Sequence, residues 1–236
     1  NNSTAAIFAH FHNVQRREAV MEGYISIHLV EDGWFWMIPL RDNIMSVGFV
    51  GDKNAFNTHS GSATELFWKK VAQSPSVAQR LAPAELLGEL TTTGNYSYCA
   101  DTSWGEGYYM IGDAFAFLDP VFSSGVLLAM KSAYRGARVA QAWLRGASEG
   151  RKAARYEERC TRAEMRRVAW LIYGINDPVL RTLFLNPRNI LRMRDAIISL
   201  LAGDFVGRWR VQAPLAAFRA VLGAMRWKWD RQRRAG

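Results

Sequence analysis

Residues 108–126, YYMIGDAFAFLDPVFSSGV, decide the fold of this chain. Tyr108 to Ile111 is a short apolar run rich in strand formers. Gly112 permits a tight turn, and Asp113 leaves the strand end with a carboxylate that can accept hydrogen bonds from sugar-like hydroxyl groups. Pro120 then stiffens the loop before a long apolar helix begins. The stretch therefore predicts a strand, a glycine corner, a proline loop and a helix start in quick succession.

The start of this helix is typical of an anion site. Ser123, Ser124 and Gly125 open the helix, so free backbone N–H groups and the positive end of the helix dipole face whatever lies against the loop. Reduced flavin carries negative charge on its N1–C2=O edge, and a halide is a second candidate for the same N–H donors. With Asp113 placed to hold ribityl or ribose hydroxyls, the layout suits a flavin.

At two motifs the chain resembles the FAD-dependent halogenases, a branch of the aromatic-hydroxylase-like flavoprotein monooxygenases. Residues 34–39, WFWMIP, fit the halogenase pattern W-x-W-x-I-P, and residues 117–125 fit the pattern F-x-x-P-x-x-S-x-G. The likeness extends from about residue 4 to about residue 225 and includes NPRN at 186–189 and ISLLAGD at 198–204. These two segments look like the C-terminal region of halogenases that act on phenols or carrier-bound pyrroles.

The resemblance implies a role for each residue of the two motifs. The catalytic residues would be Trp34, Trp36, Phe117 and Phe122. Phe117 and Pro120 would shape the mouth of a tunnel for hypohalous acid. The cofactor would be held by Gly112, Asp113, Pro120, Ser123, Ser124 and Gly125, and the halide by Ser124 and Gly125. The tryptophan motif would also keep organic substrate away from the activated flavin. The alternative for Trp34 and Trp36 is simple packing on one face of a strand.

The same resemblance implies the reaction and its partners. FADH₂ from a separate flavin reductase would react with oxygen to a C4a-hydroperoxide, and chloride or bromide would be converted to hypohalous acid. The acid would halogenate a small electron-rich aromatic substrate: a phenol, a pyrrole, or an acyl group on an acyl or peptidyl carrier protein. Phe122 occupies a place where tryptophan halogenases have a glutamate, which disfavours free tryptophan.

The chain departs from the family pattern in two ways. It contains no G-x-G-x-x-G, the motif that cradles the FAD pyrophosphate, so we expect it to be the C-terminal half to two-thirds of a longer flavoenzyme. That missing part would also supply the lysine that guides hypohalous acid. The nearest lysine in the sequence to the flavin motif, Lys131, is expected on a helix surface. In addition, Leu127 stands where phenol- and pyrrole-type enzymes commonly have histidine.

Two other functions therefore stay open. Because leucine cannot donate a hydrogen bond near a flavin, Leu127 is compatible with an FAD-dependent monooxygenase or reductase that installs no halogen. The second of these functions is that of a non-catalytic basic binding fragment. Residues 1–130 have 7 Lys and Arg against 13 Asp and Glu, net −6, while residues 131–236 have 23 against 8, net +15. This field could steer a carrier protein or an anionic lipid, although a solvated helix face is the favoured interpretation.

Composition narrows the class of protein further. A chain of 236 residues that is 49% hydrophobic can bury a substantial core. Cys99 and Cys160 are far apart, which favours reduced thiols in a cytoplasmic protein. His10 and His12 lack a third ligand signal, so no metal site is expected. No nucleic-acid motif accompanies the positive charge. The paired tryptophans in residues 226–234 would suit peripheral membrane contact, or would belong to a frayed end.

The predicted fold class is α+β, as in the C-terminal part of an FAD-binding aromatic-hydroxylase-like fold. We expect three segments: a substrate-domain sheet with a helix over 1–104, the flavin-contacting strand, loop and helix over 105–149, and a basic, all-α region over 150–236. Strands are predicted, as an antiparallel meander, at 5–14, 24–30, 34–40 and 45–50, with extended chain at 88–98 and a strand at 107–111. Helices are predicted at 62–81, 123–144, 150–172, 178–185, 190–201 and 214–227.

Overall fold

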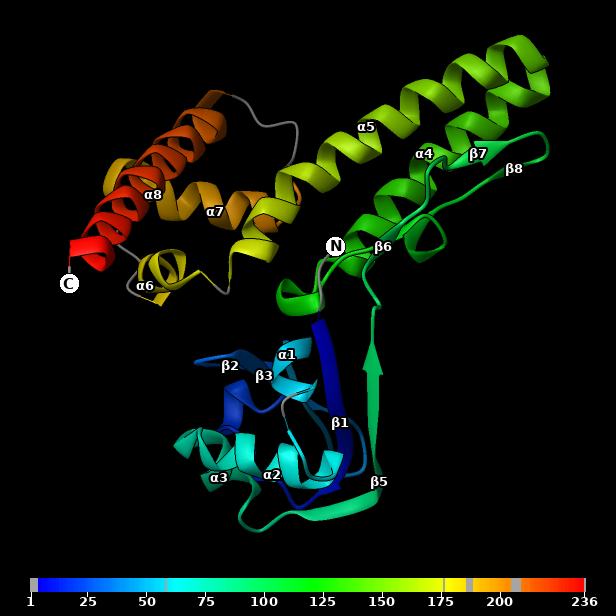
Figure 1. The fold of residues 1–236 in the computed structure, drawn as a ribbon. Helices are drawn as coiled ribbons and strands as arrows, with labels where there is room; N and C mark the ends of the chain where they lie inside the picture. The colour runs from blue at the N-terminus through cyan, green and yellow to red at the C-terminus, as the bar shows by residue number, and fades with distance from the viewer. Residues whose placement is uncertain (1–3, 58, 176, 186–188, 205–208, 236) are drawn as a thin grey trace. The chain divides into compact units, whose positions relative to one another are not determined.

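The computed structural model describes residues 4–57, 59–175, 177–185, 189–204 and 209–235 (Figure 1). The chain divides into two compact units, Asn1–Tyr96 and Ser97–Gly236. The first unit is a sheet with helices, and the second is mainly helical. The α+β fold class is thus confirmed, while the three-segment division by role stays a prediction.

A five-stranded antiparallel sheet forms the first unit. Its strands are β1 (Thr4–His12), β2 (Ser26–Val30), β3 (Gly33–Pro39), β4 (Ile44–Asp52) and β5 (Glu85–Gly94), in the order β2-β3-β4-β1-β5. Strands β2 to β4 form the predicted meander. The prediction was wrong for β1, which pairs with β4 and β5 rather than with β2. The connection from β1 to β2 is too long for a hairpin, so it leaves β1 free to pair elsewhere.

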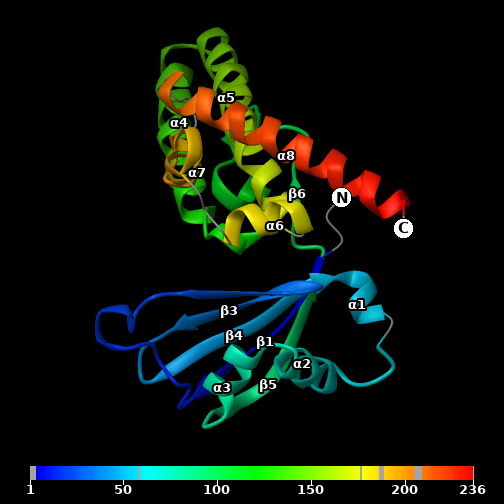
Figure 2. The same ribbon diagram turned by 90° about the vertical axis from the view of Figure 1, so that its left-hand side faces the viewer.

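Three helices belong to this unit: α1 (Lys53–Asn57), α2 (Ala63–Ala72) and α3 (Pro75–Leu81), and Figure 2 shows α2 and α3 lying along the sheet. The aromatic ring of Phe67 on α2 packs at 6.0 Å from Phe11 and at 6.1 Å from Phe35, inside the core of the unit. The single helix predicted over 62–81 is two helices, because Pro75 lacks the N–H that would continue α2 and instead begins α3.

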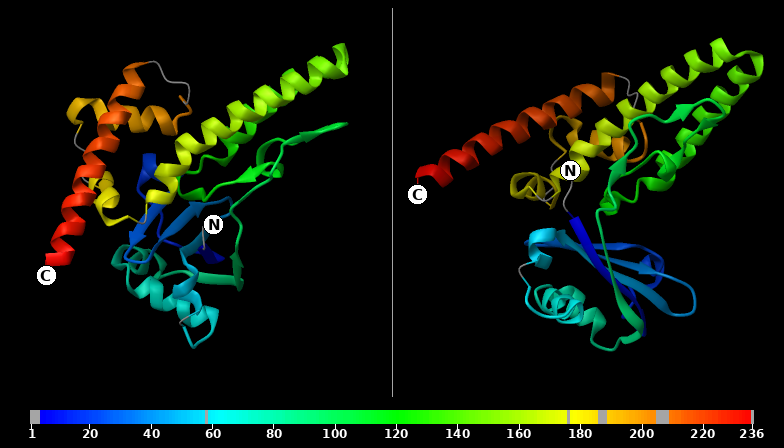
Figure 3. Two further views of the ribbon diagram at one scale, coloured as in Figure 1. Left: turned by 45° about the horizontal axis from the view of Figure 1, so that its top comes forward. Right: turned by 45° about the vertical axis from the view of Figure 1, so that its right-hand side comes forward.

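The second unit is built around two long antiparallel helices, α4 (Gly125–Arg145) and α5 (Ala147–Gly174), which Figure 3 shows side by side. Two short antiparallel ribbons precede them: β6 (Tyr98–Cys99) with β9 (Ala116–Phe117), and β7 (Trp104–Gly105) with β8 (Tyr108–Tyr109). The strand predicted over 107–111 is therefore limited to β8, because its ladder with β7 pairs only two residues of each strand.

The C-terminal helices are α6 (Pro178–Leu185), α7 (Met193–Leu201) and α8 (Trp209–Ala235), with a single 3₁₀ turn, η4 (Ile190–Arg192), before α7. The bounds of α6 match the prediction. Pro214, predicted to begin the last helix, instead lies inside α8, where Leu215, Phe218 and Leu222 are buried and keep the helix in place. Residues 186–188 of the NPRN segment lie outside the described residues.

The basic tail belongs to α8, which extends as far as Ala235. Arg226 Nε lies 2.7 Å from Asp177 Oδ2, and the guanidinium of Arg231 lies 4.7 Å from the ring centroid of Trp227. Within the described residues, no helix combines the length and the apolar character that a bilayer crossing requires.

Candidate functional site

The glycine corner is attached to α4. Gly112 opens the 3₁₀ turn η2 (Gly112–Ala114) with a φ of +51°, a left-handed conformation that costs glycine little. Its N–H donates to Ser132 Oγ at 2.8 Å, and Ser132 Oγ donates to the Ala129 carbonyl at 2.9 Å. A Cβ atom at position 112 would lie 3.1 Å from the Ala129 Cβ. The corner therefore needs glycine both for its backbone and for its approach to the helix.

The carboxylate of Asp113 faces solvent. Its side chain is exposed, and the part of the chain that the structure describes offers its carboxylate no hydrogen-bond or ion-pair partner. Its main-chain carbonyl is held by Tyr98, whose hydroxyl donates to it at 2.6 Å. The ring of Tyr98 also stacks on Phe117, with 6.4 Å between the ring centroids. The β6–β9 ribbon thus fixes the backbone of Asp113 while its carboxylate stays available.

Asp119 is a buried residue of this loop that the sequence analysis did not select. It is only 5% exposed, and its Oδ1 accepts the Val121 N–H at 3.2 Å, which caps the 3₁₀ turn η3 (Pro120–Phe122). Burial raises the pKa of this carboxyl to about 6, against the Val121 hydrogen bond, which lowers it. The available signal was its position directly before a proline, which is an N-cap arrangement.

The segment after η3 turns sharply into α4. Ser123 has a left-handed φ of 52°, and its N–H donates to the Pro120 carbonyl at 2.8 Å. Ser124 is buried and is the N-cap of α4, but its side chain makes no capping hydrogen bond. The N–H groups of the first turn, from Gly125 onward, are therefore without the usual side-chain cap. The space beside Gly125 is open, since a Cβ there would meet no atom within 4 Å.

Residues of two C-terminal segments contact this helix start. Phe122 lies against Phe184 of α6, with 5.4 Å between the ring centroids. The Leu127 side chain packs on Gly203. The contact is so close that a Cβ atom built on Gly203 would lie 2.9 Å from Leu127 Cδ2. Leu127, where the family pattern commonly has histidine, thus contributes to the packing between α4 and the end of α7.

The expected position of Lys131 on a helix surface was wrong. Rather than lying on the helix surface, it is half-buried, and its Nζ donates to the Gly203 carbonyl at 2.6 Å. Its Nζ also lies 3.9 Å from Glu164 Oε1 on α5. The reason is the packing of the α7 end on α4, which a helix pattern alone does not reveal. Lys131 therefore contributes to packing between helices.

The tryptophan motif lies in the first unit, on β3. Trp34 is buried, Trp36 is partly exposed, and their ring centroids are 6.0 Å apart. Both point away from the face that carries Phe35, which packs against α2. Trp36 Nε1 donates to Ser46 Oγ at 3.1 Å. Trp34 thus packs in the interior of the unit, as the packing interpretation expects, whereas Trp36 is only partly buried. The role of these tryptophans beside a flavin stays a prediction.

The described residues offer few other candidates for a metal or cofactor site. No group of three or more His, Cys, Asp or Glu side chains is arranged among these residues to hold a metal ion. His10 is exposed and His12 half-buried on β1, and both Cys99 and Cys160 are free thiols. The arrangement that can bind a cofactor is thus the loop segment, defined as residues 112–125.

Comparison with known proteins identifies the family. The family model described as tryptophan halogenase matches residues 4–176, which is well over half of the chain. The chain belongs to this halogenase family. The match includes β3 with its two tryptophans and the whole loop segment, and it ends just after α5.

Individual relatives agree with the family assignment. A tryptophan 2-halogenase of Chondromyces crocatus is 34% identical over 165 residues, covering 67% of this chain and 32% of that protein. A 1H-pyrrole-2-carbonyl-[peptidyl-carrier protein] chlorinase of Pseudomonas fluorescens is 34% identical over 134 residues, covering 54% of this chain and 30% of that protein. The solved structure of the flavin-dependent brominase Bmp2 superposes with a TM-score of 0.72 at 26% identity, covering 97% of this chain and 56% of that chain.

The relatives are considerably longer than this chain. It spans about a third of the two curated halogenases and just over half of the brominase structure. The Bmp2 superposition includes the C-terminal helices, which lie beyond the family match. The fold of α6 to α8 is therefore shared with a flavin-dependent halogenase.

Proposed function

We propose that this chain forms the substrate-domain and flavin-loop parts of an FAD-dependent halogenase that acts on an electron-rich aromatic substrate. One observation carries the proposal. The Gly112 N–H bond to Ser132 holds the Asp113 corner against α4, so an exposed carboxylate and an uncapped helix start belong to one loop segment. A sugar-like hydroxyl and an anionic ring edge, both present in flavin, are the groups that these two features bind.

The residues present fit FAD. Asp113 would accept hydrogen bonds from ribityl or ribose hydroxyls, since its carboxylate is exposed and unpaired within the described residues. Pro120 and Ser123 would shape the turn that faces the cofactor, and the first N–H groups of α4 would meet its anionic edge. When bound in reduced form, FAD supplies the electrons that activate oxygen for oxidation of a halide.

Chloride or bromide would bind at the same helix start. The Ser124 and Gly125 N–H groups point out of the N-terminal end of a 21-residue helix, where the dipole favours an anion. Ser124 is buried, whereas the space beside Gly125 is open and leaves room for the ion. Phe117 and Phe122, which are held by Tyr98 and Phe184, would form the apolar wall beside the ion.

The substrate and partners follow from the relatives. Because the family resemblance implies a phenol or a pyrrole, and one relative is named for a pyrrole on a peptidyl carrier protein, we infer a phenol, a pyrrole or a carrier-bound acyl group as substrate. A role of Trp34 and Trp36 in protecting the substrate stays a prediction of the family resemblance. The partners would be a flavin reductase and a carrier protein, in the cytoplasm, where the free thiols Cys99 and Cys160 stay reduced. Membrane contact through α8 stays a prediction.

Leu127 does not favour the monooxygenase alternative in this structure. Its contact with Gly203 gives the leucine a packing role, so the absence of histidine needs no change of reaction to explain it. Nor does the basic binding fragment account for a loop segment that displays an unpaired carboxylate beside an uncapped helix start. The halogenase is therefore the function that the observations support best.

Turnover tests the proposal. The protein as encoded by its gene, supplied with reduced FAD, oxygen and bromide, should brominate a phenol or a pyrrole, free or carrier-bound. Free tryptophan belongs in the same assay, because a Chondromyces relative is named for it. Product mass is the readout, since bromine gives a near-equal isotope doublet. A product that gains only oxygen would replace the halogenase with the monooxygenase alternative.

Asp113→Ala should weaken FAD binding about tenfold to a hundredfold, the effect of removing a charge-assisted hydrogen bond. The fold should be unaffected, because the carboxylate is exposed and has no partner among the described residues. Asp101→Ala is the matched control, since it also removes an exposed carboxylate of the second unit. Titration of FAD absorbance measures the affinity, and equal affinities for the two variants would remove Asp113 from the cofactor site.

A further inference from the structure

One face of α5 is lined with arginine. Arg151, Arg155, Arg159, Arg162 and Arg166 follow one another at spacings of four, four, three and four residues, which keeps them on a single side of the helix. We call these five residues the α5 arginine stripe. It extends over about 22 Å, since a helix rises about 1.5 Å per residue. The members other than Arg162 are exposed.

The acidic residues of α5 do not neutralise the exposed part of the stripe. Glu157 and Glu164 are buried on the other side of the helix and pair with Arg135 of α4. Glu158 pairs with Arg162, and Glu149 pairs with Arg145. Every glutamate of α5 is thus engaged elsewhere or with the one half-buried stripe residue.

The exposed stripe residues are left without ion pairs. Within the described part of the chain, Arg151, Arg155, Arg159 and Arg166 have no carboxylate within salt-bridge distance. Four cations of one sign on one helix face repel one another at low ionic strength, and a single-sign field of this kind attracts an acidic surface. The pattern differs from a self-neutralising helix face, in which acids and bases alternate.

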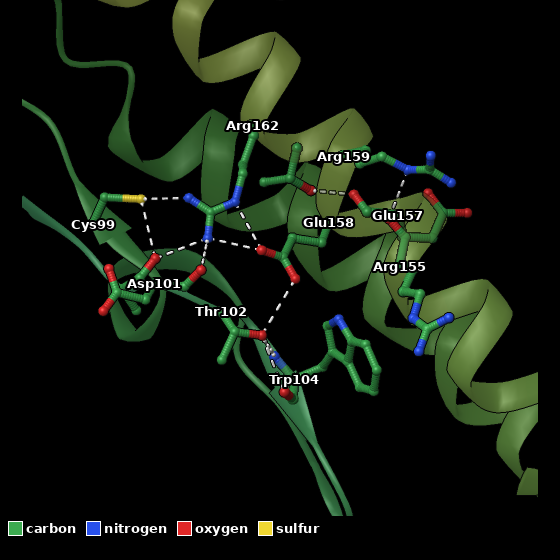
Figure 4. Close-up of polar contacts among 11 residues, drawn as sticks. Cys99, Asp101, Thr102, Trp104, Arg155, Glu157, Glu158, Arg159 and Arg162 are labelled. Carbon is green, nitrogen blue, oxygen red and sulfur yellow. Dashed lines mark hydrogen bonds and ion pairs between the residues drawn. The ribbon is translucent and has the colours of Figure 1, made fainter.

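The middle of the stripe is held in place by a neighbouring segment (Figure 4). Arg162 donates to the carbonyls of Ala100 and Asp101 at 2.9 and 2.6 Å, and to Cys99 Sγ at 3.3 Å. The guanidinium of Arg155 lies 5.8 Å from the ring centroid of Trp104. These contacts already order two of the five arginine side chains. Fewer side chains therefore lose conformational entropy when a partner binds.

We propose that the α5 arginine stripe is the docking surface for an acidic protein, the carrier protein that presents the aromatic substrate. The inference rests on the proposed function, in which the substrate is carrier-bound. Charge complementarity is the argument, because four unpaired arginines along about 22 Å match a row of carboxylates on a partner helix. A membrane is the weaker occupant, since α5 exposes no leucine, phenylalanine or tryptophan to enter a bilayer.

Charge reversal of three stripe residues tests the docking. The variant Arg151→Glu/Arg159→Glu/Arg166→Glu changes only exposed side chains that have no ion pair with a described residue, and it leaves the contacts of Arg155 and Arg162 in place. The probe is a peptidyl carrier protein loaded with 1H-pyrrole-2-carboxylate, and its dissociation constant is measured at low and at physiological ionic strength. We expect the affinity to fall at least about tenfold, and its salt dependence to become shallower.

The matched control changes the same charge elsewhere. Arg41→Glu/Lys69→Glu/Lys228→Glu also replaces three exposed cations, so both triple variants go from a net charge of +9 to +3. We expect the control to bind the carrier protein within about twofold of the unmodified chain, because its cations lie off the stripe. Equal losses in the two triple variants would overturn the docking site, since net charge alone would then explain binding.

Further binding experiments distinguish the carrier protein from other anionic partners, and distinguish binding from catalysis. Vesicles of mixed neutral and anionic phospholipid and a DNA duplex replace the carrier protein. A stripe-dependent loss confined to either of them would overturn the proposal. Binding is measured without FAD, oxygen or halide, so it does not depend on catalysis. Stripe-dependent binding without any bromination would reject the proposed function alone, whereas bromination of free pyrrole with stripe-independent carrier binding would reject the docking alone.

Discussion

Replacing Arg135 with methionine is expected to lower the free energy of unfolding by about 3–5 kcal/mol, because it removes the guanidinium that donates to two buried carboxylates. Each glutamate keeps one longer ion pair, to Arg138 at 3.2 Å or to Lys131 at 3.9 Å. Arg135 Nη1 lies 2.7 Å from Glu157 Oε2, and Nη2 lies 2.6 Å from Glu164 Oε1. The side chains of the two glutamates are only 2% and 6% exposed, so water cannot replace the lost donor. Urea unfolding of the purified variant measures the loss.

Two further variants make this result specific. Arg138→Met should cost no more than about 1 kcal/mol, because Arg138 is 56% exposed although its Nε lies 3.2 Å from Glu157 Oε1. Adding Glu157→Gln and Glu164→Gln to Arg135→Met should recover most of the stability, since the buried charges are then gone. If Arg135→Met cost no more than Arg138→Met, the pairing of α4 with α5 would not depend on these ions.

Replacing Asp119 with asparagine should stabilise the protein at pH 8 by about 3 kcal/mol, as expected for a carboxyl whose pKa rises from 3.8 to about 6 on folding. Burial is the cause, because the side chain is 5% exposed and, among the described residues, the hydrogen bond to its carboxylate comes from the Val121 N–H. The folded state prefers the protonated acid. The native protein is therefore favoured below pH 3.8 and loses this stabilisation as the pH rises through about 6.

The measurement is the difference in unfolding free energy between Asp119→Asn and the unmodified protein across this pH range. Asparagine keeps an oxygen that can accept the Val121 N–H, so the difference should be small near pH 4 and should grow toward pH 8. A difference that does not change with pH would show that Asp119 titrates as an ordinary exposed acid. Asp113→Asn is the matched control, because it neutralises an exposed aspartate of the same loop.

Much of the fold follows from local patterns in the sequence. The predicted strands at 24–30, 34–40 and 45–50 overlap β2, β3 and β4 closely, because runs of β-branched and aromatic residues separated by an Asp-Gly turn and an Arg-Asp-Asn turn specify them. The order of the strands could not be predicted in the same way. The pairing of β1 with β4 is a contact between distant residues, and it depends on which apolar faces meet in the folded sheet.

The loop segment shows the same limit at individual residues. Gly112 and Asp113 were selected for their chemistry. In the structure Gly112 has a left-handed φ and Asp113 is exposed, while their role in cofactor binding stays a prediction. The burial of Asp119 and the two contacts of Gly203, with Leu127 and with Lys131, were not predictable, because they arise when helices far apart in the sequence pack on α4. Motif spacing therefore identifies the loop but not the residues that support it.

The most direct test of the central claim, that the start of α4 binds the halide, is the bromide KM of a Val126→Asp variant. Val126 is 73% exposed in the first turn of α4, and an aspartate there would compete with bromide for the same N–H groups while stabilising the helix. Val126→Asn, similar in size but neutral, is the control. We predict that the bromide KM rises at least about tenfold for aspartate and stays within about twofold for asparagine. An equal bromide KM in the two variants would contradict the account.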